Sequence, residues 1–105
     1  MDIQIVAATT SIANCLQIVK DLRNDGIAKE DLLVITNLTT REIIFNNHNL
    51  RQSDGSVFSS HSLIQNVKHI LILSDLEKDG PIPEALVPYK ERIEFGSMII
   101  AVLNK

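Results

Sequence analysis

The stretch SDGSVFSSHS gathers the residue types of nucleophilic catalysis. It places Asp54 and His61 around several serines, and these types could serve as acid, base and nucleophile. A reactive serine needs a rigid turn and a base within hydrogen-bond reach, and the sequence contains no Gly-x-Ser-x-Gly elbow to supply that turn. The same residue types are typical of an exposed polar loop. We therefore predict no catalytic residue.

A second candidate is a binding site for a small anion. Thr9, Thr10 and Ser11 stand between the first expected strand and the first expected helix. Hydroxyls and backbone N–H groups at a helix N-terminus form a generic anion site, and His48 and His61 would complete it if they converge on that turn. Plain N-capping is the simpler interpretation, because it accounts for the three hydroxyls without a ligand.

Metal binding and thiol chemistry are weaker candidates. The histidines, His48, His61 and His69, lack the spacing that places two imidazoles on one helix face, and no cysteine or carboxylate completes a ligand set. The single cysteine, Cys15, lies on the apolar face of the expected first helix, where cysteines are usually inert packing groups. The four glycines are isolated, which excludes a glycine-rich phosphate loop. We predict no metal and no cofactor.

Composition narrows the class of protein. The chain has 105 residues, of which 45% are apolar and 22% charged, a profile that predicts one soluble domain over residues 1–105. Its net charge is -3 and its ten Lys and Arg residues are scattered, which argues against a nucleic-acid partner. The longest apolar run has the length of a strand, so we expect no membrane span. The lone cysteine and the lack of a signal peptide favour the cytoplasm.

Hydrophobic periodicity predicts the elements that position these residues. An alternating strand over residues 2–9 leads into an amphipathic helix within residues 9–26, with Thr10 or Ser11 as its N-cap and Gly26 at its end, and the apolar run 32–36 forms a second strand. A short helix follows with Thr39 as its N-cap, because Glu stands three residues further on. The serine-rich residues 51–60 are expected to form a mobile loop.

The second half of the chain is expected to be mostly helical. Apolar residues recur at helical spacing from His61 to Gly80, although HILILSD alone would equally form a buried strand, and we favour one continuous helix. A further helix from Pro88 to Phe95 precedes a closing apolar strand. The predicted fold is therefore a small α/β domain of order β-α-β-α-α-α-β. Its sheet is mixed or parallel, with three strands, or four if residues 69–73 form a strand.

Two separated stretches carry a family resemblance. LRNDGIAKEDLLVIT contains a helix end, a turn, an acidic triplet and a strand, and YKERIEFGSMIIAV contains a tyrosine, a charged helix, a glycine and an apolar strand. Both resemble the YflT-type heat-induced general stress protein domain of Bacillus and its relatives. The positions that match are Leu22, Gly26, Asp31, Leu32, Val34, Tyr89, Ile93, Gly96, Ile99 and Val102. The resemblance implies a bacterial, stress-associated α/β domain without established catalytic residues.

The preferred function is a non-catalytic, general-stress-associated binding or protein-interaction domain. A small sheet has edges that need cover, and Ile43, Phe45 and Val57 are expected on surface that a second copy would protect. We therefore expect a homodimer or another protein partner. The alternative is a small-molecule sensor or small enzyme that uses the loop over residues 46–62 together with the turn from Thr9 to Ser11.

Overall fold

The computed structural model describes residues 2–46, 49–51, 57–59 and 61–104. Its main helices and strands are, in chain order, β1 (Ile3–Thr9), α1 (Ile12–Asn24), β2 (Leu32–Thr36), α2 (Leu38–Asn46), β3 (Asn49–Arg51), β4 (Val57–Ser59), α3 (His61–Asn66), β5 (His69–Ile72), α4 (Leu73–Lys78), α5 (Lys90–Glu94) and β6 (Met98–Leu103). Two short 3-10 helices, η1 (Lys29–Asp31) and η2 (Glu84–Tyr89), precede β2 and α5.

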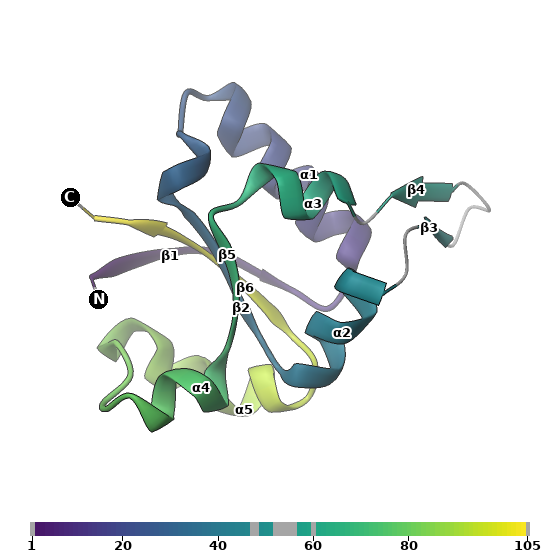
Figure 1. Cartoon of the computed structure of the whole chain (residues 1–105). Coiled ribbons are helices and arrows are strands. Elements are labelled where there is room, and N and C mark those ends of the chain that lie inside the picture. The colour runs from purple at the N-terminus through teal and green to yellow at the C-terminus, as the bar shows by residue number, and fades with distance from the viewer. Residues whose placement is uncertain (1, 47–48, 52–56, 60, 105) are drawn as a thin grey trace.

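The main sheet has the strand order β1-β6-β2-β5 within the described residues (Figure 1). β6 is antiparallel to both of its neighbours, β1 and β2, whereas β2 is parallel to β5. The predicted class, a small α/β fold with a mixed sheet, is confirmed. β1, α1 and β2 form a strand-helix-strand unit, and β6 lies between the two strands of this unit.

Helices cover both faces of this sheet (Figure 1). On one face, α1 and α3 pack with Ile44 of α2 against the strands, including Ile100 of β6, and form a first buried cluster. On the other face, α4, η2 and α5 contribute Leu73, Leu86 and Ile93 to a second buried cluster. No helix among the described residues is long and apolar enough to cross a membrane.

The prediction of one helix from His61 to Gly80 is wrong. This segment forms α3, β5 and α4 instead. Ile70 lies opposite Val34 in the parallel pairing with β2, and just before β5 the N–H of Lys68 donates to the carbonyl of Leu32 at 2.8 Å. A short apolar run fits both periodicities, and backbone pairing with β2 selects the strand.

Two helix boundaries also differ from the predictions. Asn37, and not Thr39, caps α2, because its Oδ1 accepts the backbone N–H of Thr40 at 2.8 Å. The helix predicted from Pro88 to Phe95 is shorter, since the proline lies inside η2 and regular α-helix begins only with α5.

The segment predicted as a loop over residues 51–60 contains strand residues. β3 and β4 form an antiparallel pair in which Leu50 lies opposite Phe58. Residues 52–56 and 60 lie outside the described residues. The prediction of a loop is therefore wrong at Arg51 and over β4, which belong to strands.

The first strand is less covered than the sequence indicates. β1 is an edge strand, and its register with β6 shifts between Ile5 and Ala7. The intervening Val6 is 42% exposed. An extra residue of this kind shifts the alternation of side chains, so that Ile5 packs in the second cluster and Ala7 in the first.

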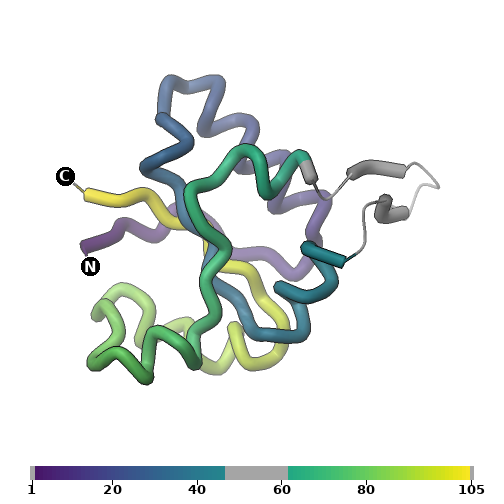
Figure 2. The backbone as a smooth tube through the Cα atoms, in the orientation of Figure 1, coloured from purple at the N-terminus to yellow at the C-terminus, as the bar shows by residue number. Residues whose placement is uncertain are grey.

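The two ends of the domain lie side by side (Figure 2). In the β1–β6 pairing, Ile3 lies opposite Leu103. Beyond it, the N–H of Asn104 donates to the carbonyl of Asp2 at 3.0 Å.

Candidate functional site

A groove follows one edge of the main sheet, where β5 has β2 as a neighbour on one side only within the described residues. Five consecutive residues, Val67 to Leu71, line it, so it runs along the backbone of β5. Arg41 and Phe45 of α2 and Ile64 of α3 form the rest of the lining. Its volume is about 300 Å³. We call this feature the β5 groove.

The cap of α2 places Arg41 and Phe45 beside β5. Asn37 accepts the N–H of Thr40 at the start of the helix, and its Nδ2 donates to the carbonyl of Glu94 at 3.2 Å. The start of α2 is thereby fastened to the end of α5. Arg41 and Phe45 are four residues apart, which puts them on the same face of the helix.

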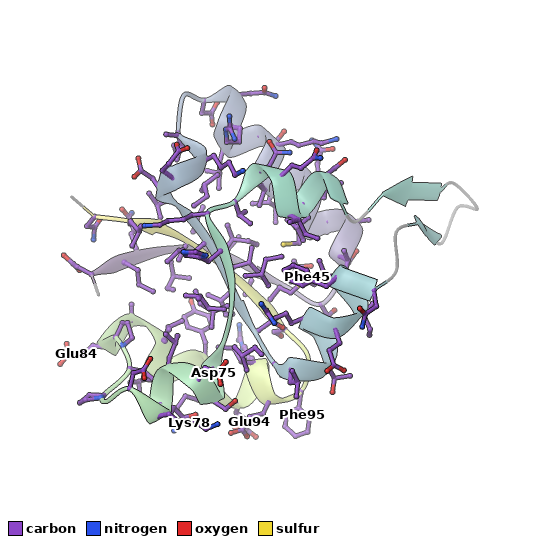
Figure 3. All side chains as sticks on the ribbon, viewed as in Figure 1. Phe45, Asp75, Lys78, Glu84, Glu94 and Phe95 are labelled. Atoms are coloured by element: carbon purple, nitrogen blue, oxygen red, sulfur yellow. The ribbon has the colours of Figure 1, made fainter. Side chains whose placement is uncertain are left out.

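Arg41 makes two contacts inside the groove. Its Nε donates a hydrogen bond of 2.9 Å to the carbonyl of Ile70, so the side chain rests on the backbone of β5. Its guanidinium carbon lies 4.6 Å from the centre of the Phe45 ring, within the range of a cation–π contact. Phe45 lies on the side of α2 that faces β5 (Figure 3) and is 39% exposed. The guanidinium therefore links an exposed aromatic ring to the edge strand.

The remaining lining of the β5 groove combines apolar and cationic side chains. Val67 and Ile70 are buried, and Ile64 is half-buried against the first cluster. Lys68 and His69 are exposed, and the ammonium group of Lys68 adds to the positive charge that Arg41 gives the groove. No carboxylate is among the described residues that line it. The arrangement suits an occupant that carries apolar groups and negative charge.

The predicted turn at the N-terminus of α1 has a capping role. The Oγ of Ser11 accepts the backbone N–H of Asn14 at 3.2 Å. The Oγ1 of Thr9 accepts the N–H of Ser11 and the Nδ2 of Asn14, each at 3.1 Å. Thr10 is exposed. These contacts agree with the capping interpretation of the turn. The hydroxyl oxygens of Thr9 and Ser11 already accept hydrogen bonds within the turn.

The histidines of the predicted anion site cannot be placed against this turn. His48 lies outside the described residues, as does Asp54, while His61 begins α3 and only its backbone is described. His69, for which no ligand role was predicted, lines the β5 groove. The convergence of His48 or His61 with Thr9 and Ser11 therefore stays a prediction.

Cys15 is a core residue, as predicted. Its side chain is fully buried in the first cluster beside Leu16 and Val19. Desolvation by burial raises the pKa of the Cys15 thiol to about 12. The thiol is therefore neutral at physiological pH and poorly suited to nucleophilic chemistry.

A second cavity, of about 110 Å³, lies where the parallel strands β2 and β5 end. Such carboxyl ends are where open α/β sheets commonly bind ligands. The cavity is lined by Asn37, Leu38, Ile72, Leu73, Ser74, Glu77, Ile93 and Glu94. Its two carboxylates come from separate helices, and the described residues contain no group of three or more side chains that could hold a metal ion. Of these two cavities, the β5 groove is the larger.

Sequence reasoning placed Phe45 on exposed surface, as the structure shows, but missed the other residues that form the β5 groove. Arg41 and Lys68 were counted only among the scattered basic residues. No local sequence pattern shows that α2 lies beside β5, whose Ile70 follows Arg41 by 29 residues. The one local signal is the spacing of Arg41 and Phe45 within REIIF, which places a cation and an aromatic ring on one helix face. Comparisons with models of protein families, with curated proteins and with solved structures find no match to this chain.

Proposed function

We propose that this domain is a non-catalytic, stress-associated protein-interaction module that binds its partner in the β5 groove. The observation that carries the proposal is the exposed Phe45 ring, held beside an edge strand by the guanidinium of Arg41. Aromatic residues and arginine are enriched at the centres of protein interfaces. The stress association rests on the resemblance of two sequence stretches to the general stress protein family.

The alternative function, a sensor of small anions or a small enzyme at the Thr9 to Ser11 turn, has less support. Thr9 and Ser11 already accept hydrogen bonds from within the helix start. A ligand at that turn would have to compete with these contacts. The β5 groove, by contrast, offers an aromatic side chain and cationic groups at the surface.

Site-specific photocross-linking tests the proposal. A benzophenone amino acid replaces Phe45 in one variant and Val87 in a control variant, since Val87 is an exposed apolar residue of η2 on the opposite face of the sheet. Both variants are produced in the native cells before and after heat stress. We expect a discrete protein adduct from position 45 that increases with stress, and none of the same mass from position 87.

The captured partner is then purified and titrated against wild type, Phe45→Ala and Val87→Ala. We expect Phe45→Ala to weaken binding about tenfold or more, as truncation of an interface anchor does, and Val87→Ala to bind like wild type. Equal binding by Phe45→Ala and wild type would overturn the proposal.

A thermal-shift screen with nucleotides, metabolites and anions separates the two functions. A compound that raises the melting temperature of wild type, but not of a Thr9→Ala and Ser11→Ala double variant, would support the sensor instead. Sedimentation velocity over a wide concentration range distinguishes a foreign partner from a second copy of the chain. A homodimer that Phe45→Ala dissolves would identify the partner as the chain itself.

A further inference from the structure

Among the described residues, β5 is an edge strand of the main sheet, and it forms one wall of the β5 groove. Such a strand presents backbone N–H and C=O groups along the side that has no neighbour, and an extended peptide can add to it as a further strand. The groove is lined by His69, Ile70 and Leu71 of β5 and by Val67 and Lys68, which lead into the strand. An added strand beside β5 would therefore lie against this lining.

The charge of the groove restricts what can bind there. Arg41 and Lys68 contribute cationic groups to the lining, and no described lining residue contributes a carboxylate. The surrounding protein has a net charge of -3, so the groove differs in sign from the whole chain. An acidic segment would be attracted to the groove and a basic one repelled.

The apolar part of the groove restricts the segment further. Phe45, Ile64 and Val67 line it, and Phe45 is the most exposed of the three. Successive side chains of a strand point to opposite faces. A segment that alternates apolar and acidic residues would therefore direct one set of side chains to these apolar groups and keep its carboxylates at the cationic rim.

Resting on the proposed function, we propose that the partner contributes an extended, acidic segment in which apolar and acidic residues alternate, and that this segment adds as a strand beside β5. In the free protein, Arg41 donates to the Ile70 carbonyl. A carboxylate of the bound segment competes for the same guanidinium. Arg41 thus covers the edge when the groove is empty and contacts the partner when it is filled.

The probe for this proposal is an eight-residue peptide that alternates glutamate with valine or isoleucine. Both of its ends are blocked, so that only side chains carry charge. A matched peptide carries lysine at every glutamate position. We expect the acidic peptide to shift the amide resonances of Val67 to Leu71 more than those of any other described segment. Its binding should weaken by about tenfold or more between low and high salt, because the attraction between charges is screened. The lysine peptide should leave these resonances unchanged.

The variant Lys68→Glu tests the role of charge, since Lys68 is exposed and its change leaves the core intact. We expect it to lose affinity for the acidic peptide at least tenfold and to gain affinity for the lysine peptide, with an unchanged melting temperature. The control Lys78→Glu, at an exposed lysine of α4 on the opposite face, should bind the acidic peptide as wild type does.

Three results would overturn this inference. The first is equal binding of both peptides, or shifts that lie outside Val67 to Leu71. The second is a cross-linked partner that depends on Phe45 but neither competes with the acidic peptide nor responds to salt. In the second case the proposed function would stand while the nature of the segment would be wrong. Self-association through Phe45 without peptide binding would likewise identify a second copy as the occupant and overturn the acidic segment.

Discussion

The thiol of Cys15 shows how burial removes chemistry from a reactive residue type. It lies fully inside the first cluster, and desolvation raises its pKa from the ordinary 9.0 to about 12. A thiol reacts as the thiolate. The residue therefore contributes packing, and its proton is held more tightly in the folded state than in the unfolded state.

The raised pKa of Cys15 predicts a loss of stability at alkaline pH. Below pH 9 both states keep the thiol proton, so the stabilisation by the neutral thiol is complete; it is lost as the pH rises toward 12. Between these values the unfolded chain releases the proton and the folded chain keeps it, which lowers the free energy of unfolding by about 1.4 kcal/mol per pH unit.

Urea unfolding of wild type and Cys15→Ala from pH 8 to pH 10.5 measures this effect. We expect the wild-type stability to fall more steeply than that of Cys15→Ala above pH 9, because other groups titrate alike in both proteins. A thiol reagent should label native Cys15 only through unfolding. Parallel curves, or rapid labelling of the folded protein, would contradict the burial of this thiol.

The hydroxyl of Thr36 is a second residue whose effect can be isolated. Thr36 is fully buried at the end of β2, and its Oγ1 donates to the carbonyl of Ser97 at 3.1 Å. Thr36→Val keeps the shape and removes the donor, so we expect a loss of about 1 to 3 kcal/mol in the free energy of unfolding. Denaturant titration provides the value. Thr36→Ser, which keeps the hydroxyl, is the control for the hydrogen bond, and equal stability of wild type and Thr36→Val would show that the bond contributes nothing.

Among the strands and helices, β6 has the central role because it joins β1 to the rest of the main sheet. It pairs with β1 on one side and β2 on the other, and its successive residues Met98 to Ala101 are all buried because helices cover both faces. Deleting Ile99 to Lys105 should therefore abolish cooperative unfolding. Circular dichroism on heating checks this, with deletion of residues 104 and 105 alone as a control that retains β6 and should still melt cooperatively. A cooperative transition in the longer deletion would contradict the central position of β6.

The elements that the sequence predicted well are those with one clear periodicity. The apolar stripe of α1, with Cys15 and Val19 toward the core, follows from its spacing alone. β6 was also predictable, because an apolar run shorter than a helix and preceded by a glycine indicates a buried strand. β5 was predicted wrongly, since HILILSD fits both periods and only pairing with the distant Val34 decides between them.

The candidate site was largely beyond the reach of the sequence. The contact between Arg41 and Ile70 joins an α-helix to a strand across 29 residues, and the strand itself had been assigned to a helix. The proximity of site residues that come from separate elements can be recognised only once the topology is known. The N-terminal turn, by contrast, was a local feature, and its capping interpretation agrees with the hydrogen bonds of Ser11 and Thr9.

Charge is unevenly distributed over the whole molecule. From Leu73 to Phe95 there are six acidic and three basic side chains, so this segment alone accounts for the net charge of -3. It forms the layer of α4, η2 and α5, where Asp75, Glu84 and Glu94 lie at the surface (Figure 3). The β5 groove, with its cationic rim, is lined by α2, α3 and β5. An acidic partner would be oriented by this asymmetry before contact.

The proximity of Asp2 and Asn104 predicts that the order of elements can be permuted. Joining these ends with a short Gly-Ser linker and opening the chain between Gly80 and Pro81, which are both exposed, preserves every strand pairing. We expect the permuted chain to fold with about the stability of wild type, since surface breaks of this kind are tolerated. Denaturant titration compares the free energies of unfolding of wild type and the permuted chain. A permutant opened between Ile99 and Ile100, within β6, is the control that should not fold. Failure of both would show that the exposed turn is required for folding.

The place of β6 also has a consequence for the order of events on the ribosome. β1, α1 and β2 emerge early, yet the strand that must separate β1 from β2 is translated after every other strand of the domain. Until then the inner edges of β1 and β2 lack their partner, and contacts of such long sequence separation form slowly. The sheet of the nascent chain can therefore close only once Met98 to Leu103 have left the exit tunnel.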